Sequence, residues 1–297
     1  MTVHPVERRL RSALPVTRFM QSYLPLPAAR WLIAQGVTRT HLAADVNREA
    51  VSADGVGCEW IIPQNSRTDR VLLYLHGGGF VFGLTPLHLE LVAYLAQKMG
   101  IRGLMVDYRL APDHPFPAAL DDCLTAYHWL LKQGIGAQNI VVAGDSAGGN
   151  LTLTTMMKLR DSGDPLPAAA ACLSPLANCA DKRNPPEGFS DPVLPPKVLE
   201  FYTRSYAAHN DPRNPLISPL FGDWQGLPPL LIHAGEKEVL REDALRVEAL
   251  ARSAGVDVRL EIYPRMWHVW QIHPALPQTV QSLDDIARFL ATSGSPV

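Results

Sequence analysis

The sequence lacks a surplus of basic residues and any clustered set of cysteines. Its 297 residues carry 27 Lys and Arg against 29 Asp and Glu, a net charge of −2, whereas nucleic-acid-binding proteins usually carry a basic excess. The four cysteines form no C-x-x-C pair, which excludes a zinc-ribbon or thioredoxin-like motif. Scattered in this way, they are typical of small buried hydrophobic residues in a reducing compartment. The cysteines are Cys58, Cys123, Cys172 and Cys179.

Long hydrophobic runs are also missing. No stretch reaches the ~18 consecutive apolar residues of a membrane helix, and Pro15, Pro25 and Pro27 interrupt the basic N-terminus before a secretory signal can form. We therefore expect a cytoplasmic protein without a membrane span. With 47% apolar and 19% charged residues, the chain can bury a large core, and its length suits one α/β domain or a core with a lid.

Short apolar runs alternate with helical patterns over most of the chain. The run at 71–75, VLLYL, is continuously apolar, as in a strand buried on both faces. This alternation predicts a mostly parallel central sheet with helices on both faces. The predicted strands are 56–62, 71–75, 103–108, 139–144, 168–174, 229–235 and 258–263, of which 168–174 is the weakest because alanine is a poor strand former. The predicted helices are 86–99, 117–133, 147–161, 242–254 and 275–292.

Two regions depart from this alternation. Residues 1–45 suggest short helices broken by prolines, and residues 178–228 are rich in proline with one helical stretch at 197–209. We expect 1–45 and 178–228 to form a helical cap, or lid, over the carboxyl edge of the sheet, and 46–177 with 229–297 to form the α/β catalytic domain. We expect most of the cap's aromatic residues to pack it rather than to line a pocket; these are Phe189, Phe201, Tyr202 and Tyr206.

The strongest local motif is Gly144-Asp145-Ser146-Ala147-Gly148-Gly149, which fits G-x-S-x-G between a buried strand and a helix. Such a nucleophile elbow turns sharply and forces the serine into a strained backbone conformation, so small neighbours are required on both sides. The turn would raise the Ser146 hydroxyl above the sheet edge and point the N–H of Ala147 at the same place. An ordinary glycine-rich turn is the alternative.

A second motif, His76-Gly77-Gly78-Gly79, directly follows the predicted strand 71–75. Successive glycines let backbone N–H groups turn outward, and acyl transfer requires such donors at the developing oxyanion. Gly78 and Gly79 would supply two donors and Ala147 a third. We expect His76 to hold this loop through hydrogen bonds.

A serine hydroxyl needs a base, and the base needs an acid. The chain has ten histidines. His268 lies in the loop after the predicted strand 258–263, and this loop opens on the sheet edge where Ser146 emerges. His233 lies inside a predicted strand and is expected to be a core residue. The order nucleophile, acid, base expected of an α/β-hydrolase places the acid between them. Glu242 and Asp243 are expected to complement a helix dipole, so Glu236 and Glu238 both remain candidates from the residues alone.

These motifs together resemble the hormone-sensitive-lipase family of α/β-hydrolases, the bacterial group often called family IV esterases. The resemblance runs from about residue 70 to the C-terminus. It rests on His76–Gly79 (HGGG), Asp107–Leu120 (DYRLAPDHPFPAAL), Gly144–Gly149 (GDSAGG) and the Tyr263–His268 loop.

Carried over residue by residue, the resemblance implies Ser146 as nucleophile, His268 as base, and the N–H groups of Gly78, Gly79 and Ala147 as the oxyanion hole. Many family members have an aspartate where this chain has Glu238, three residues past the glycine that ends the strand. The resemblance thus implies a Ser-His-Glu triad, in which the longer glutamate takes the acid's place.

The expected activity is that of a carboxylesterase on esters of short to medium acyl chains, through an acyl-enzyme and without metal or organic cofactor. The alternatives are a non-catalytic small-molecule receptor on the same fold, or cleavage of amides or long-chain lipids by the same triad. Family likeness also implies a homodimer through the edge strand VRLEIY.

Overall fold

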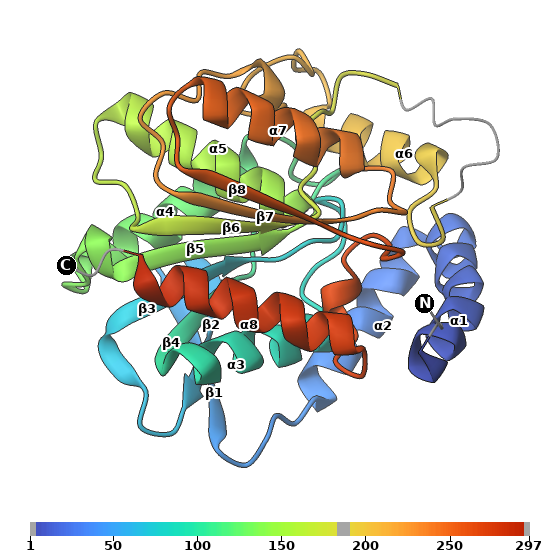
Figure 1. Ribbon diagram of the computed structural model, residues 1–297, viewed down its shortest axis with the longest axis horizontal. Helices are drawn as coiled ribbons and strands as arrows, with labels where there is room; N and C mark the ends of the chain where they lie inside the picture. The colour runs from blue at the N-terminus through green and yellow to red at the C-terminus, as the bar shows by residue number, and fades with distance from the viewer. Residues whose placement is uncertain (1–3, 183–190, 294–297) are drawn as a thin grey trace.

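The computed structural model describes residues 4–182 and 191–293, and of residues 15–23 only the backbone. Its centre is an eight-stranded sheet in the order β1-β2-β4-β3-β5-β6-β7-β8 (Figure 1). β1 pairs with β2 and β2 with β4 in antiparallel fashion, while the remaining pairs are parallel. The mostly parallel sheet is therefore confirmed. The strands are β1 Val46–Ala53, β2 Val56–Pro63, β3 Arg67–Leu75, β4 Ile101–Val106, β5 Ile140–Asp145, β6 Ala169–Leu173, β7 Leu230–Gly235 and β8 Val258–Tyr263.

Helices cover both faces of the sheet. α3 and α8 pack together on one face, and α4, α5 and α7 lie on the other (Figure 1). The α-helices are α1 Pro5–Tyr23, α2 Leu26–Arg39, α3 Pro86–Met99, α4 Ala118–Lys132, α5 Ala147–Ser162, α6 Pro196–Ala207, α7 Arg241–Ser253 and α8 Pro277–Thr292. Three 3₁₀ turns, Ala137–Asn139, Pro219–Phe221 and Trp270–Ile272, complete the described elements.

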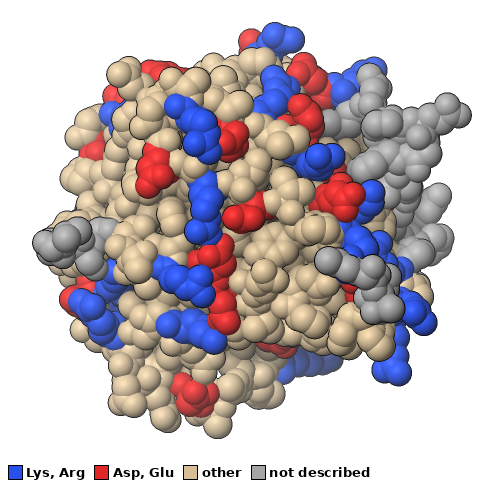
Figure 2. Space-filling model, in the orientation of Figure 1, with Lys and Arg blue, Asp and Glu red and all other residues tan. Residues whose placement is uncertain are grey.

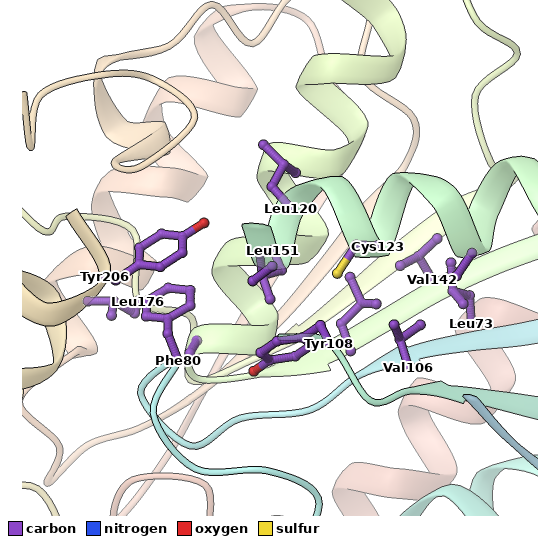
Figure 3. Close-up of a cluster of buried hydrophobic side chains, with 14 of the residues drawn as sticks. Leu73, Phe80, Val106, Tyr108, Leu120, Cys123, Val142, Leu151, Leu176 and Tyr206 are labelled. Atoms are coloured by element: carbon purple, nitrogen blue, oxygen red, sulfur yellow. The ribbon is translucent and has the colours of Figure 1, made fainter. Parts of the chain in front are cut away.

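The second half of β3, Val71–Leu75, is apolar at every position because successive side chains enter different cores. In β3, Val71, Leu73 and Leu75 join the core under α4 and α5, whereas Leu72 and Tyr74 join the core under α3 and α8. Full burial of one such aliphatic side chain stabilises the fold by about 1.5–3 kcal/mol. Figure 3 shows part of the first core, where Leu73, Val106 and Val142 of three neighbouring strands lie together and Leu151 of α5 approaches.

The weak prediction for 168–174 is confirmed as β6, Ala169–Leu173, in which every residue is buried. Alanine's low strand propensity is overridden because β6 is paired on both sides, with β5 and β7, inside the sheet. Small side chains at this position also leave room for the helices that cover both faces.

One strand was not anticipated. β1 pairs with β2 through a two-residue turn at Asp54-Gly55, with φ of 50° and 98°. An Asp-Gly pair between extended segments is a strong hairpin signal, because both turn positions need positive φ. The apolar pattern of the sequence did not predict β1, because it is an edge strand with mostly exposed or half-buried side chains.

The expectation of short N-terminal helices broken by prolines is wrong for Pro15. α1 runs from Pro5 to Tyr23 through that residue, although an interior proline removes one helical hydrogen bond. Tertiary packing offsets this loss, since Leu14 is buried against Trp267 and Trp270. Pro25 and Pro27 do mark a boundary, because α2 begins at Leu26.

α1, α2 and α6 gather at one end of the strands (Figure 1). α2 is fixed there by Arg30, which donates to the carbonyls of Val81 and Ala111 in the loops after β3 and β4. The division of the chain into a cap and a catalytic domain stays a prediction, and Phe189 lies outside the described residues.

The surface shows no large patch of one charge on the face drawn in Figure 2, where Lys and Arg alternate with Asp and Glu. Within the described ranges, no helix is long and apolar enough to cross a membrane. The four cysteines are buried, as expected of small hydrophobic residues.

Candidate active site

Ser146 lies in the sharp turn between β5 and α5, as the G-x-S-x-G motif predicts. Its backbone has φ 54° and ψ −116°, a strained conformation for a residue with a side chain. The turn is held by the Ser146 N–H, which donates to the carbonyl of Leu173 over 2.8 Å. The side chain is 7% exposed, so the hydroxyl is largely removed from water but not sealed.

The elbow packs directly against the start of the glycine loop. A Cβ on Gly148 would lie 1.9 Å from the carbonyl oxygen of Leu75, the last residue of β3. A Cβ on Gly144 would lie 2.4 Å from the Gly148 carbonyl oxygen. Both positions therefore admit only glycine without a backbone shift. This contact sets the start of the HGGG loop against the serine.

Asp145, the residue before the serine, ties the two motifs together. Its buried carboxylate accepts hydrogen bonds from the Gly77 N–H over 2.9 Å and from the Tyr74 hydroxyl over 2.8 Å, and it lies 3.3 Å from His88 Nε2. Burial acts to raise the pKa of Asp145, but His88 and these donors outweigh it and hold the pKa below its usual value. An ionised carboxylate thus anchors the glycine loop to the elbow.

His76 is fully buried and supports the same loop, as expected. Its Nδ1 lies 2.7 Å from the Gly77 carbonyl, and its ring stacks on Tyr108 with centroids 4.1 Å apart. Burial lowers the pKa of His76 to about 3, so the ring is neutral. His233, also fully buried, bonds to Ser282 and Asp285 and is a core residue, as predicted.

Gly78 and Gly79 adopt left-handed conformations, with φ of 120° and 62°. Across the described part of the chain, their N–H groups donate to no protein acceptor. Ala147 is the first residue of α5, where helical N–H groups have no partner within the helix. The absence of a protein acceptor for these N–H groups among the described residues is compatible with their predicted role.

His268 meets Ser146 from the loop after β8. Its Nε2 lies 2.9 Å from Ser146 Oγ, and its side chain is 8% exposed. This loop is held against the loop after β7, which carries Glu236 and Glu238 and is called the acid loop below, since the Lys237 N–H donates to the Met266 carbonyl over 2.8 Å. A hydroxyl and an imidazole in this contact can exchange a proton directly.

Glu238 lies behind His268, with its Oε2 3.5 Å from the ring Nδ1. This distance is longer than a good hydrogen bond, and such contacts often shorten only when substrate binds. Burial acts to lower the pKa of His268, but the Glu238 carboxylate outweighs it, so the pKa lies above its usual 6.5. Burial raises the pKa of Glu238, a rise opposed by His268 and Ser174.

The other three carboxylates of this loop lie elsewhere. Glu236 accepts from the backbone N–H of Arg265 over 2.8 Å, and Glu242 is exposed at the start of α7. Asp243 is buried but accepts from the N–H groups of Ala177 and Asn178. Only Glu238 among the four reaches His268, so geometry separates the two candidates that the residues left open.

Sequence reasoning missed two buried polar residues beside Glu238. Ser174 follows β6 directly, and its hydroxyl contacts the Glu238 carboxylate. Asp191 accepts from the N–H groups of Val193, Leu194 and Val239, which joins the segment before α6 to the acid loop. Ser174 could have been found as a polar residue at the carboxyl end of a central strand, whereas Asp191 carried no signal.

Aromatic side chains of α6 close over the glycine loop. The Tyr202 ring lies so near Gly79 that a Cβ there would be 2.2 Å from it, and Tyr206 stacks on Phe80 with centroids 3.7 Å apart (Figure 3). Phe201 points outward and is 49% exposed. Tyr206 therefore packs α6 against Phe80, while Tyr202 contacts the glycine loop at Gly79.

The described ranges contain no group of three His, Cys, Asp or Glu side chains placed to hold a metal ion. The contact between Ser146 Oγ and His268 Nε2 allows proton transfer between these two side chains.

Comparison with known proteins decides the family. A family described as the alpha/beta hydrolase fold matches residues 72–272. An acetyl-hydrolase of Streptomyces hygroscopicus is 41% identical over 249 residues, which cover 82% of this chain and 83% of that protein. The chain belongs to the α/β-hydrolase family.

Solved structures place this α/β-hydrolase more closely. An esterase from the bacterial hormone-sensitive lipase family is 36% identical and aligns with a TM-score of 0.90 over 99% of this chain and 100% of that one. A variant of the esterase E40 is 37% identical, with a TM-score of 0.92 over 99% and 100% of the two chains. The resemblance to the hormone-sensitive-lipase family is therefore confirmed.

The contact at Gly148 generates a prediction about this α/β-hydrolase. Gly148→Ala would press a methyl group on the Leu75 carbonyl, and we expect it to lower the free energy of unfolding by about 2–3 kcal/mol, the upper range for overpacking. Urea denaturation would measure it. The matched control is Gly163→Ala, where a Cβ meets no atom within 4 Å, although its φ of 72° makes alanine mildly strained. A loss at Gly148 no larger than at Gly163 would contradict the close contact.

Proposed function

We propose that this carboxylic ester hydrolase cleaves esters of short to medium acyl chains through a Ser146-His268-Glu238 triad and a covalent acyl-enzyme. One observation carries the proposal: the hydroxyl of a strained serine lies 2.9 Å from the imidazole Nε2 of His268, at a strand-to-helix elbow. A core serine would have no reason to occupy such a backbone conformation. The esterase and acetyl-hydrolase names of the relatives support the same class of reaction.

In the first half of the reaction, His268 Nε2 accepts the Ser146 proton as Oγ attacks the ester carbonyl carbon. The carbonyl π electrons move to oxygen and form a tetrahedral oxyanion. When the oxyanion collapses, the bond to the alcohol oxygen breaks, and His268 returns its proton to the leaving alcohol. An acyl group remains on Ser146.

In the second half, water takes the place of the alcohol. His268 removes a proton from water as it attacks the acyl carbon, and the same proton then returns to Ser146 Oγ as the acid product leaves. Glu238 stabilises the imidazolium in both halves. It also favours the neutral tautomer in which Nδ1 carries the proton, so that Nε2 is free to accept the proton of Ser146.

The N–H groups of Gly78, Gly79 and Ala147 stabilise the oxyanion in this proposal. Donors that are oriented before the reaction need no reorganisation as charge develops, and each is typically worth about 2.7–4 kcal/mol. Asp145 supports them indirectly, because its hydrogen bond to Gly77 anchors the chain one residue before the first donor.

The preference for short acyl chains is supported by the ring of Tyr202, which occupies space beside Gly79. Residues 1–45 and 178–228 act as the cap in this proposal, with Tyr202 at its inner surface. A cytoplasmic location and a homodimer through the edge strand β8 belong to the same proposal.

Replacing the nucleophile is the first test. Ser146→Ala removes the attacking atom, and we expect kcat on p-nitrophenyl butyrate to fall by at least about a thousandfold. Ser218→Ala is the matched control, because Ser218 is a buried serine that lies outside the proposed triad. Retention of a tenth or more of the wild-type kcat would overturn the assignment. A parallel anilide substrate separates ester from amide cleavage.

The acid gives a prediction of pH dependence. Only neutral His268 can accept a proton, so kcat/KM should rise with pH through a midpoint above the ordinary histidine value of 6.5, since Glu238 raises the His268 pKa. Glu238→Gln removes that charge, so the midpoint should move to lower pH while kcat falls by about a thousandfold or more. Exposed Glu242→Gln is the control, and equal effects in both variants would refute Glu238 as the acid.

The cap generates a prediction about substrate size. Tyr202→Ala removes the ring beside Gly79, and we expect the ratio of kcat/KM for p-nitrophenyl octanoate to that for the acetate to rise several-fold. Exposed Phe201→Ala, one residue away on α6, should leave the ratio unchanged. An unchanged ratio in Tyr202→Ala would show that this ring does not limit the acyl chain.

A further inference from the structure

Ser174 is a fully buried serine that belongs to none of the motifs in the sequence. It directly follows β6, so it lies at the same edge of the sheet as Ser146 and the acid and histidine loops. Its backbone N–H donates to the carbonyl of His233 over 2.7 Å, which fixes it beside the neighbouring strand β7.

The Ser174 hydroxyl is hydrogen-bonded to both loops that carry the triad. It donates to Glu238 Oε2 over 2.7 Å, and it accepts from the N–H of Val269 over 3.1 Å. Val269 is the residue after His268, so one hydroxyl connects the acid to the backbone of the base. Because the Val269 N–H occupies a lone pair of the hydroxyl, the hydroxyl proton is directed at the carboxylate.

Glu238 depends on this contact for its orientation. Among the described residues, its Oε1 has no hydrogen-bond partner, and Ser174 is the one side chain that donates to Oε2. Oε2 is also the oxygen that lies 3.5 Å from His268 Nδ1. The Ser174 hydroxyl therefore determines which carboxylate oxygen faces the imidazole and at what angle.

The backbone of Ser174 adds an independent argument. Its φ is 50°, in the left-handed region that favours glycine. Such a conformation costs of order 1–3 kcal/mol for a residue with a side chain. Glycine would fit this backbone with less strain, so the presence of serine here indicates a use for the hydroxyl.

We propose that Ser174 is a positioning residue that holds Glu238 behind His268 and couples the acid loop to the histidine loop. The inference rests on the proposed triad, since Ser174 acts through Glu238 and touches no reacting atom. Its loss should reduce kcat, because a misplacement of about 1 Å in catalytic geometry can cost up to about a hundredfold. KM should be unaffected, because the side chain is buried away from the substrate.

The test uses Ser174→Gly, which keeps the left-handed backbone without strain but removes the hydroxyl. We expect kcat on p-nitrophenyl butyrate to fall ten- to a hundredfold, KM to change less than twofold, and the protein to remain folded, because the relieved backbone strain offsets the loss of the two hydrogen bonds of the hydroxyl. Ser174→Ala, with the strain retained, should show the same loss of kcat.

The control is Ser218→Ala. Ser218 is equally buried, accepts from the Cys179 N–H over 2.8 Å and donates to the Pro212 carbonyl over 2.6 Å, so it makes the same pair of bonds away from the triad. Its kcat should stay near that of the wild type.

A double mutant separates positioning through Glu238 from a general structural role. In a Glu238→Gln background, adding Ser174→Gly should lower kcat by less than twofold. The reason is that Ser174 acts through the Glu238 carboxylate, which this variant already lacks. Wild-type kcat in folded Ser174→Gly or Ser174→Ala would overturn the inference, as would a full additional loss in the double mutant. If Ser146→Ala is inactive while Ser174→Gly is fully active, the proposed function stands and only this inference fails.

Discussion

The contact between Gly148 and the carbonyl of Leu75 is the constraint on which the site depends. It brings the end of β3 against the start of α5 so closely that neither backbone can move independently. The serine of the elbow and the glycine loop are consequently parts of one rigid unit. Asp145 strengthens that unit with a charged hydrogen bond to Gly77, which holds the proposed oxyanion donors in place relative to Ser146.

The proposed acid and base, Glu238 and His268, are held in a different way. Glu238 and His268 come from loops after adjacent strands, β7 and β8, which are tied by backbone hydrogen bonds such as Lys237 to Met266. Burial of the carboxylate carries an electrostatic cost that the imidazole and the Ser174 hydroxyl offset. The Glu238 carboxylate also favours the charged form of His268, since it raises the pKa of the imidazole.

The helices at the carboxyl end of the sheet contact the loops that carry the site residues. α2 reaches the loop after the glycine motif through Arg30, and α6 covers Gly79 with Tyr202. Glu7 of α1 pairs with Arg265 in the loop that carries the histidine. Contacts from three helices thus converge on the loops around Ser146 and His268.

The sequence by itself determined the fold class and the elbow, because both are recorded in short-range patterns. Continuously apolar strands such as 71–75 require helices on both faces, and small residues around Ser146 are required by a turn that nothing larger fits. Two features did not follow from apolar patterns. β1 is an exposed edge strand that only its Asp54-Gly55 turn indicates. The continuity of α1 through Pro15 depends on the packing of Leu14.

Only the tertiary structure decided which carboxylate stands behind His268 and what holds it there. Glu236 and Glu238 are two residues apart and chemically alike, so no local pattern distinguishes the one that turns inward from the one that bonds to Arg265. Ser174 reaches Glu238 from 64 positions away in the chain. Contacts between residues so distant in sequence exist only once the strands have paired, because it is the order of strands in the sheet that brings their ends together.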